Sequence, residues 1–219
     1  SDFRAHSVIY TIADVFDAHD RERFEIYGYS FGPNDDSEIR KRIINTVDVF
    51  HDVKEMGDKD IALLARQDKI DIAIDINGYT KLCRPGIFAY RAAPIQIHFW
   101  GSANTSGTDF IDYYIADNIG IPEEYEHHWS ESIIRLPIWS QSRHKNNYVS
   151  DQLITRKDMG LPEHGFIFCN FNNSYKLSPI EFDIWMRLLD QVEDSVLWLL
   201  KPTKWVETNL QQEARKRGV

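Results

Sequence analysis

Cysteine is scarce in this sequence: only Cys83 and Cys169 occur among 219 residues, and they lie far apart. No CxxC pair and no zinc-ligand spacing is present, so the sequence favours neither a disulfide framework nor a bound metal. We therefore expect both cysteines to be buried free thiols in a protein of a reducing compartment.

Long apolar runs are missing as well. The longest, such as residues 196–200, are far too short to cross a bilayer, and no basic start followed by an apolar segment marks a signal peptide. These absences predict a soluble, cytoplasmic protein without a membrane partner.

Positive charge is in short supply. The 34 Asp and Glu residues outnumber the 25 Lys and Arg residues, which gives a net charge of −9 and argues against a general nucleic-acid-binding protein. Two local basic clusters, residues 40–42 and 215–217, are interpreted as solvated helix faces. No nucleic-acid partner is therefore expected.

The hydrophobic residues, 42% of the chain, follow two periodicities. Spacings of three and four residues predict helices over residues 7–18, 37–44, 58–67, 179–192 and 206–217. Short apolar or alternating runs predict strands over residues 24–31, 70–76, 95–100, 113–116, 133–136, 166–170 and 196–200. Helices that alternate with short apolar strands imply an α/β fold with a parallel sheet.

The order of these elements predicts two domains. Residues 1–138 form the first α/β unit, and because it opens on a helix, we expect its first strand to lie upstream of Ser1. Residues 139–164 are predicted to be a polar linker. Residues 165–219 are predicted to begin a second α/β unit that continues past Val219.

Several familiar catalytic motifs are absent, among them GxxxxGK[ST], GxGxxG, HExxH and GxSxG. His127 and His128 are adjacent, so we expect surface histidines whose side chains point in different directions. Asp71 and Asp75 fall on one face of a predicted strand and could form a glycosidase pair. The favoured interpretation is that Asp75 ends the strand and orders the following turn.

The most informative segment runs from Asp75 to Gly107. It is interpreted as a strand, a turn, a short helix, a second strand and a loop rich in glycine, serine and threonine. Loops beyond the carboxyl ends of parallel strands are where open α/β sheets bind ligands. Thr105, Ser106 and Gly107 could offer N–H and hydroxyl donors there, with an ordinary turn as the alternative.

Several blocks resemble the catalytic region of protein O-GlcNAc transferases. They are SDFRAHS at the start, NGYTK at 77–81, RAAPIQ at 91–96, GSANTSG at 101–107, DFIDYYIAD at 109–117, FCNFNNSYKLSP at 168–179 and SVLWLLKP at 195–202. The resemblance runs through nearly all of the chain. It implies the Rossmann-like GT-B fold, with residues 1–138 as the acceptor-side lobe and residues 165–219 as the start of the nucleotide-sugar lobe.

The resemblance also implies an activity. Such enzymes transfer N-acetylglucosamine from UDP-GlcNAc to serine or threonine hydroxyls of proteins, with inversion and without a metal or other cofactor. The implied partners are therefore a nucleotide sugar and a protein or peptide acceptor. The family holds the nucleotide sugar between its two lobes.

The matching blocks imply roles for individual residues. His6 stands at the family's proposed catalytic histidine, and a histidine can accept a hydroxyl proton near neutral pH. Lys176 matches the lysine that contacts the diphosphate, just before a predicted helix start, and Asn173 and Tyr175 belong to the same nucleotide-sugar-binding block. Thr105, Ser106 and Gly107 would face the sugar or phosphate.

Some positions depart from the family pattern and keep alternatives open. Ser102-Ala103-Asn104 replaces Tyr-Pro-Gly, and Asn173 replaces a glutamine in a way that resembles O-fucosyltransferases, which use GDP-fucose. The His-Thr-Thr-Gly-Met-Asp segment that grips the diphosphate is expected beyond Val219. We therefore expect this chain not to catalyse transfer alone, and a non-catalytic binding module stays a further alternative.

Overall fold

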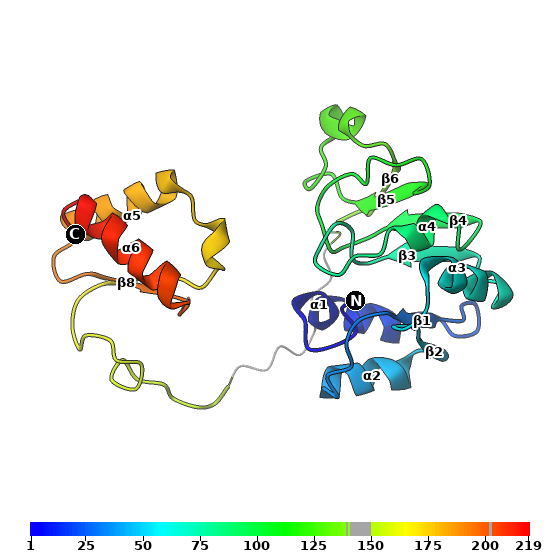
Figure 1. Cartoon of the computed structure of the whole chain (residues 1–219), viewed down its shortest axis with the longest axis horizontal. Helices are drawn as coiled ribbons and strands as arrows, with labels where there is room; N and C mark the ends of the chain where they lie inside the picture. Colours follow the sequence, from blue (N-terminus) through cyan, green and yellow to red (C-terminus); the bar gives the residue numbers. More distant parts are fainter. Residues whose placement is uncertain (139, 141–149, 202) are drawn as a thin grey trace. The chain divides into compact units, whose positions relative to one another are not determined.

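The computed structural model describes residues 1–138, 140, 150–201 and 203–219. The chain forms two compact units, Ser1–Tyr148 and Val149–Val219 (Figure 1). The division falls within the predicted linker, residues 139–164, of which residues 139 and 141–149 lie outside the described part.

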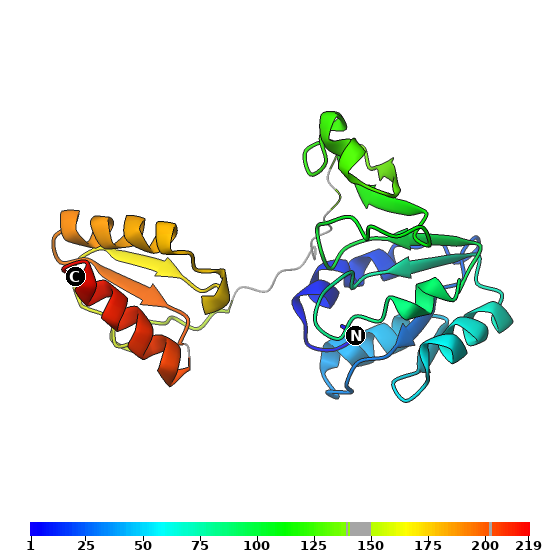
Figure 2. The same ribbon diagram turned by 45° about the horizontal axis from the view of Figure 1, so that its top comes forward.

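The first unit is built from parallel strands and the helices that connect them (Figure 2). Its helices are α1 (Ser7–Asp17), α2 (Glu38–Thr46), α3 (Asp58–Gln67) and α4 (Gly86–Ala89), with the 3-10 helix η1 (Glu123–His128). Its strands are β1 (Tyr27–Ser30), β2 (Val49–Asp52), β3 (Ile72–Asp75), β4 (Ile95–His98), β5 (Tyr113–Ala116) and β6 (Ser132–Arg135). β1 pairs with β2, and the other four form one sheet in the order β3-β4-β5-β6. Every pairing is parallel, so the predicted α/β architecture is confirmed.

Two apolar clusters hold the helices against the strands. α1 and α2 pack around Ile9 and Ile43, which are fully buried, and α3 and α4 pack around Ile61 and Phe88. Ile9 and Ile12 lie three residues apart on α1, so they share its buried face. Burying one such side chain stabilises the fold by roughly 1.5–3 kcal/mol.

The strand register decides which side chains reach the carboxyl edge of the sheet. Asp75 at the end of β3 pairs with His98 at the end of β4, so both side chains lie on one face. Gln96 lies on the same face, and its amide donates to the carbonyl oxygens of Phe88 and Phe110 at 2.9 and 2.6 Å. The buried Gln96 side chain therefore fills this face below the loops that follow β3 and β4.

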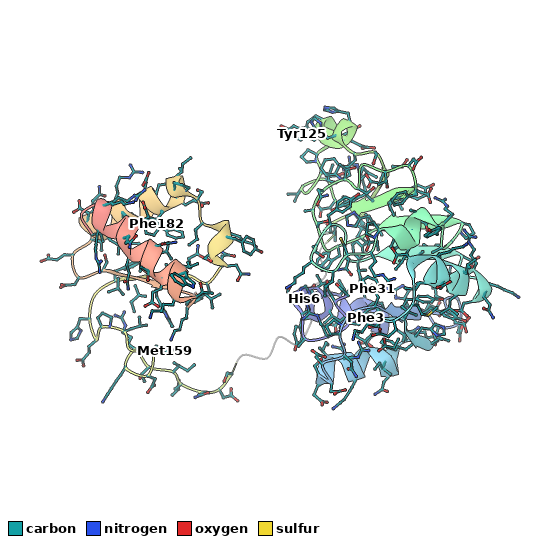
Figure 3. The ribbon with its side chains drawn as sticks, viewed as in Figure 1. Phe3, His6, Phe31, Tyr125, Met159 and Phe182 are labelled. Carbon is teal, nitrogen blue, oxygen red and sulfur yellow. The ribbon has the colours of Figure 1, made fainter. Side chains whose placement is uncertain are left out.

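The second unit has one parallel strand pair and two long helices. Its elements are β7 (Ile167–Asn170), the 3-10 helix η2 (Ser174–Lys176), α5 (Pro179–Gln191), β8 (Val196–Leu199) and α6 (Lys204–Lys216). Arg217, at the end of α6, donates to Asp183 of α5 at 2.5 Å and lies over the ring of Phe182, labelled in Figure 3. The two helices therefore contact each other. Within the described residues, none of the helices combines the length and apolar character needed to cross a membrane.

The predicted solvated face at residues 40–42 is wrong for Arg40. Its guanidinium is buried and donates to the Phe3 carbonyl at 2.8 Å, the Ser30 hydroxyl at 2.9 Å and the Asp52 carboxylate at 2.9 Å. The N-terminal segment lies across this side chain, a long-range contact that charge patterning cannot show. Arg40 therefore ties the segment that carries His6 to the ends of β1 and β2.

The prediction of buried thiols is wrong for Cys169, which is exposed, and Cys83 is only partly buried. β7 belongs to a two-stranded sheet in the described chain, so its outer side chains have little to cover them. His127 and His128 are exposed as predicted, but their ring centroids lie only 3.9 Å apart. Rotation about the side-chain bonds at the end of the short helix η1 brings the rings together, although the Cα–Cβ bonds diverge.

Asp117, at the end of β5, is a buried carboxylate with four donors around it. It accepts from the backbone N–H groups of Ile119, Gly120 and Ser140 at 2.9, 2.7 and 2.8 Å, and from the Ser140 hydroxyl at 2.6 Å. The hydrogen bonds from Ser140 and Gly120 hold the pKa of Asp117 well below its usual range. The charged form therefore anchors the chain beyond β6 to the end of β5.

We expect this anchor to weaken in acid. A carboxyl whose pKa is lower in the folded state contributes stability above its unfolded pKa of about 3.9, and that contribution is lost as pH falls through the folded pKa. Asp117→Asn should lower the free energy of unfolding at pH 7 by about 2 kcal/mol, because hydrogen bonds to a charged acceptor are lost. The deficit should shrink between pH 4 and pH 2, as measured by urea unfolding.

The exposed Asp109 supplies the matched control. Asp109→Asn should leave the free energy of unfolding within about 0.5 kcal/mol of wild type. A deficit for Asp117→Asn that stays constant with pH would contradict the role of the charge.

Candidate active site

The turn after β3 is organised by Asp75. Its carboxylate accepts from the backbone N–H groups of Asn77 at 2.9 Å and Gly78 at 3.1 Å, so the predicted role in ordering the turn is confirmed. Both oxygens are engaged by the backbone, and Asp71 is exposed. This arrangement does not favour the glycosidase pair.

His6 caps the N-terminus of α1, where its Nδ1 accepts from the Val8 backbone N–H at 3.3 Å (Figure 3). The same nitrogen lies 3.5 Å from the carboxylate of Asp2, which is buried, while the imidazole is one-third exposed, at 33%. The Asn77 side chain donates to Asp2 at 3.2 Å. The His6 segment therefore lies against the turn that follows β3.

Further contacts hold the His6 segment in place. The Ala5 N–H donates to the Asp35 carboxylate at 2.6 Å, and Arg40 binds the Phe3 carbonyl. On α1, the Thr11 hydroxyl accepts from the Trp100 indole N–H at 2.9 Å. These contacts bring together His6, the turn after β3 and the start of the loop after β4.

That loop, residues 101–107, contains the three residues predicted to bind a sugar or phosphate, and each of them has a donor engaged within the chain. The Thr105 hydroxyl and the Ser106 N–H donate to Glu131 at 2.7 and 2.6 Å, and the Gly107 N–H donates to the Thr105 hydroxyl at 3.0 Å. Thr105, Ser106 and Gly107 therefore hold the shape of the loop through hydrogen bonds within the chain. Their predicted contact with a sugar or phosphate stays a prediction.

Glu131 was not identified from the sequence, where a single glutamate before a short strand carries no signal. Its side chain is buried between the loop and the start of β6. Burial would raise the pKa of Glu131, but the hydrogen bonds from Ser106 and Thr105 outweigh it and hold that pKa below its usual value. The carboxylate is therefore charged at neutral pH.

His98 is the second residue that the sequence did not single out. It lines a small pocket together with Asp75, Tyr79 and Ser106, and its Nε2 lies 3.0 Å from the Trp100 carbonyl oxygen. Its Nδ1 is buried without a hydrogen-bond partner among the described residues. The pocket opens beside the 101–107 loop, so His98 belongs to the same site.

The second unit places Asn173, Tyr175 and Lys176 on one short turn. Asn173 precedes η2, its carbonyl accepts from the Lys176 N–H at 3.0 Å, and all three side chains are exposed. The turn leads directly into α5, whose N-cap is Ser178. The three predicted nucleotide-sugar-binding residues therefore present their side chains together at a helix start.

The first turn of α5 contains an acidic side chain, Glu181. Glu181 completes a capping box: its carboxylate accepts from the Ser178 N–H at 2.9 Å, and the Ser178 hydroxyl accepts from the Glu181 N–H. The Ser178 backbone hydrogen bond lowers the pKa of Glu181, so its charge is kept at neutral pH. This charge partly offsets the helix dipole, which leaves Lys176 as the main source of positive charge on the turn.

No group of three or more His, Cys, Asp or Glu side chains in the described parts of the chain could hold a metal ion. The Lys176 ammonium is the exposed positive group that this turn offers an anion, because Pro179 has no N–H and the N–H groups of Ser178 and Glu181 are already engaged in the capping box.

Comparison with known proteins identifies relatives along the whole chain. The family model described as glycosyl transferase family 41 matches residues 1–142 and 141–219. The Arabidopsis thaliana protein named "Probable UDP-N-acetylglucosamine--peptide N-acetylglucosaminyltransferase SEC" is 38% identical over 224 residues, covering 100% of this chain and 23% of that protein. SPINDLY of the same plant, named as the same kind of transferase, is 29% identical over 90% of this chain and 21% of its own length.

A solved structure shows the same fold. A point mutant of the O-GlcNAc transferase of Thermobaculum terrenum superposes with a TM-score of 0.84 at 25% identity, covering 100% of this chain and 41% of that chain. The predicted GT-B-type α/β fold is thereby confirmed. The chain spans about a quarter of the length of the curated relatives that it matches.

Proposed function

The chain belongs to glycosyl transferase family 41, and from that premise we propose that it functions in transferring N-acetylglucosamine from UDP-GlcNAc to serine and threonine hydroxyls of proteins. The observation that carries the proposal is the 38% identity, along the whole chain, to a relative named as a peptide N-acetylglucosaminyltransferase. The partners proposed are a nucleotide sugar and a protein or peptide acceptor. The proposed compartment is the cytoplasm.

The proposed mechanism uses the protein's own charges, without a metal. Lys176 neutralises the negative charge that develops on the diphosphate as the bond to the sugar breaks, and the part of the α5 dipole that Glu181 does not offset adds to this effect. The exposed position of Lys176, next to that helix start, supports this role.

His6 is proposed to contact the acceptor hydroxyl. The imidazole is partly exposed and is held by its contacts with Val8 and Asp2, so Nε2 is available to a hydroxyl group. Nε2 can accept the hydroxyl proton as the oxygen attacks the sugar in the tautomer that carries its proton on Nδ1. In that tautomer the Nδ1–H group faces the Asp2 carboxylate, 3.5 Å away, and no longer accepts from the Val8 N–H.

A second candidate donor is GDP-fucose. Asn173, which replaces the more usual glutamine, is exposed on the turn that carries Lys176, so its side chain is free to contact a nucleotide. Tyr175 and Lys176 favour the N-acetylglucosamine branch. The alternative that is not an enzyme is a non-catalytic binding module, which keeps the fold and binds a nucleotide.

The test is calorimetric titration of the natural full-length protein and of residues 1–219 with UDP, UDP-GlcNAc and GDP-fucose, followed by transfer of labelled sugar to a peptide library. Binding of UDP and transfer of N-acetylglucosamine are expected for the full-length protein. Preference for GDP-fucose would move the assignment to the fucosyl branch. Nucleotide binding without transfer would favour the binding module, and no binding would refute the transferase.

A further inference from the structure

We propose that Glu131 is a positioning residue, which holds the loop of residues 101–107 in the shape that binds the donor sugar. The proposal rests on the proposed function, because the donor role of this loop belongs to it. Glu131 lies about 25 residues away in sequence, at the entry to β6, and no motif includes it.

The buried Glu131 carboxylate accepts three hydrogen bonds, from Ser106, Thr105 and Ser130, and we call this group of contacts the clamp. Oε1 accepts from the Ser106 backbone N–H at 2.6 Å. Oε2 accepts from the Thr105 hydroxyl at 2.7 Å and from the Ser130 hydroxyl at 3.2 Å. Glu131 is only 4% exposed, so water competes little for these bonds, and those from Ser106 and Thr105, at 2.6 and 2.7 Å, are of the short, charge-assisted kind.

A second residue holds the loop from the opposite side. The Tyr79 backbone N–H donates to the Ser102 hydroxyl at 3.0 Å, and the Tyr79 hydroxyl donates to the Ser106 carbonyl at 2.6 Å. Ser106 is therefore fixed through both its N–H and its carbonyl group, by Glu131 and Tyr79. Without Glu131, the loop keeps its attachment to the turn after β3, but on the side of β6 it keeps only the contacts between Thr105 and Ser130.

The hydrogen-bond pattern requires a carboxylate at this position. The Thr105 hydroxyl oxygen already accepts from the Gly107 and Ser130 backbone N–H groups at 3.0 and 3.1 Å, so its own hydrogen must be donated outward. An amide in place of Glu131 would direct an NH2 group either at the Ser106 N–H or at this hydroxyl group. Toward Ser106, a donor would face a donor. Toward Thr105, the NH2 group would meet an oxygen that already accepts twice, and the Thr105 hydroxyl would lose Glu131 as its acceptor, whereas both carboxylate oxygens accept.

Glu131→Gln tests the clamp in the natural full-length protein. We expect the KM for UDP-GlcNAc to rise about 10-fold, with kcat within about threefold of wild type, because a misplaced loop weakens donor binding. Amide hydrogen exchange of the 101–107 segment, measured by mass spectrometry, should become at least about 10-fold faster. A change confined to stability would leave the KM of the folded enzyme unchanged.

A second pair of variants keeps the proposal testable if Glu131→Gln does not fold. Thr105→Val removes the hydroxyl group and should raise both the KM and the exchange rate of the loop as Glu131→Gln does, whereas Thr105→Ser keeps the hydroxyl group and should raise both by clearly less than Thr105→Val. The exposed Glu124 provides the matched control, and Glu124→Gln should change neither the KM nor the exchange rate.

The possible outcomes separate the two proposals. If the wild-type protein transfers the sugar but Glu131→Gln keeps its KM, or leaves exchange of the loop unchanged, the role of Glu131 is refuted. If Thr105→Ser raises the KM as much as Thr105→Val, the hydroxyl contact is refuted. A wild-type protein that neither binds nor transfers from UDP-GlcNAc contradicts the proposed function itself.

Discussion

Replacement of Lys176 by alanine should lower kcat/KM for UDP-GlcNAc about 10²- to 10³-fold, the usual cost of losing one group that stabilises transition-state charge. Lys176 lies on an exposed turn directly before α5, and Glu181 offsets part of the dipole of that helix. The ammonium group therefore supplies most of the positive charge at this place. Initial rates of sugar transfer at several donor concentrations measure the effect.

The division of this loss between kcat and KM tests the mechanism. If Lys176 acts on the leaving group, kcat should fall more than the KM rises, because the charge on the diphosphate grows as the bond breaks. Lys176→Arg keeps the charge and should recover part of the rate.

The control for Lys176 is another exposed lysine of the second unit. Lys157→Ala removes the same charge away from the turn and should leave kcat/KM within about twofold of wild type. If Lys176→Ala stays within threefold of wild type, Lys176 does not stabilise the leaving group. The fold of each variant can be checked by circular dichroism, because an exposed lysine contributes little to stability.

Much of the fold was predictable because its elements have strong local signals. The predicted bounds of α3 and β5 match the structure, and Ser37 caps the helix that it was expected to begin. β2 was missed because its four residues, two of them His and Asp, show no apolar alternation. Its pairing with β1 is a long-range property that a local pattern does not carry.

The site was predictable only in part, for the same reason. His6 and Lys176 stand in matched blocks, and the structure places His6 directly before the helix predicted from residue 7 and Lys176 on a turn before the helix predicted from residue 179. Glu131 was missed, and Arg40 was wrongly predicted to lie on a solvated helix face. Both residues act through contacts with residues that are distant in sequence. Glu131 contacts Thr105, and Arg40 contacts Phe3. Buried charges of this kind become visible only when the chain is folded.

A large loss of stability is expected from Gly101→Ala. Gly101 has φ +81°, and a Cβ atom there would overlap the carbonyl group of Asn77 and lie 2.7 Å from the carbonyl oxygen of Ile76. The left-handed conformation costs a non-glycine residue about 1–2 kcal/mol, and crowding against backbone typically adds a further 1–3 kcal/mol. We expect the free energy of unfolding to fall by at least about 3 kcal/mol, as measured by urea unfolding.

The overlap should also disturb the proposed catalytic histidine. Asn77 donates to Asp2, and Asp2 lies beside His6, so a displaced Asn77 changes the setting of the His6 segment. Activity should therefore fall in Gly101→Ala even at low temperature, where the variant is still folded.

Gly107→Ala separates crowding from backbone conformation in the same loop. Gly107 also has a positive φ, +63°, but a Cβ atom there meets nothing within 4 Å. Its replacement should cost only the conformational term, about 1 kcal/mol, and should leave the Asn77 turn in place. If the two variants are destabilised equally, the close approach of Gly101 to the Asn77 carbonyl group does not limit stability. A loss at Gly101 that exceeds the loss at Gly107 by at least about 2 kcal/mol would show that the turn after β3 and the loop after β4 are packed backbone against backbone.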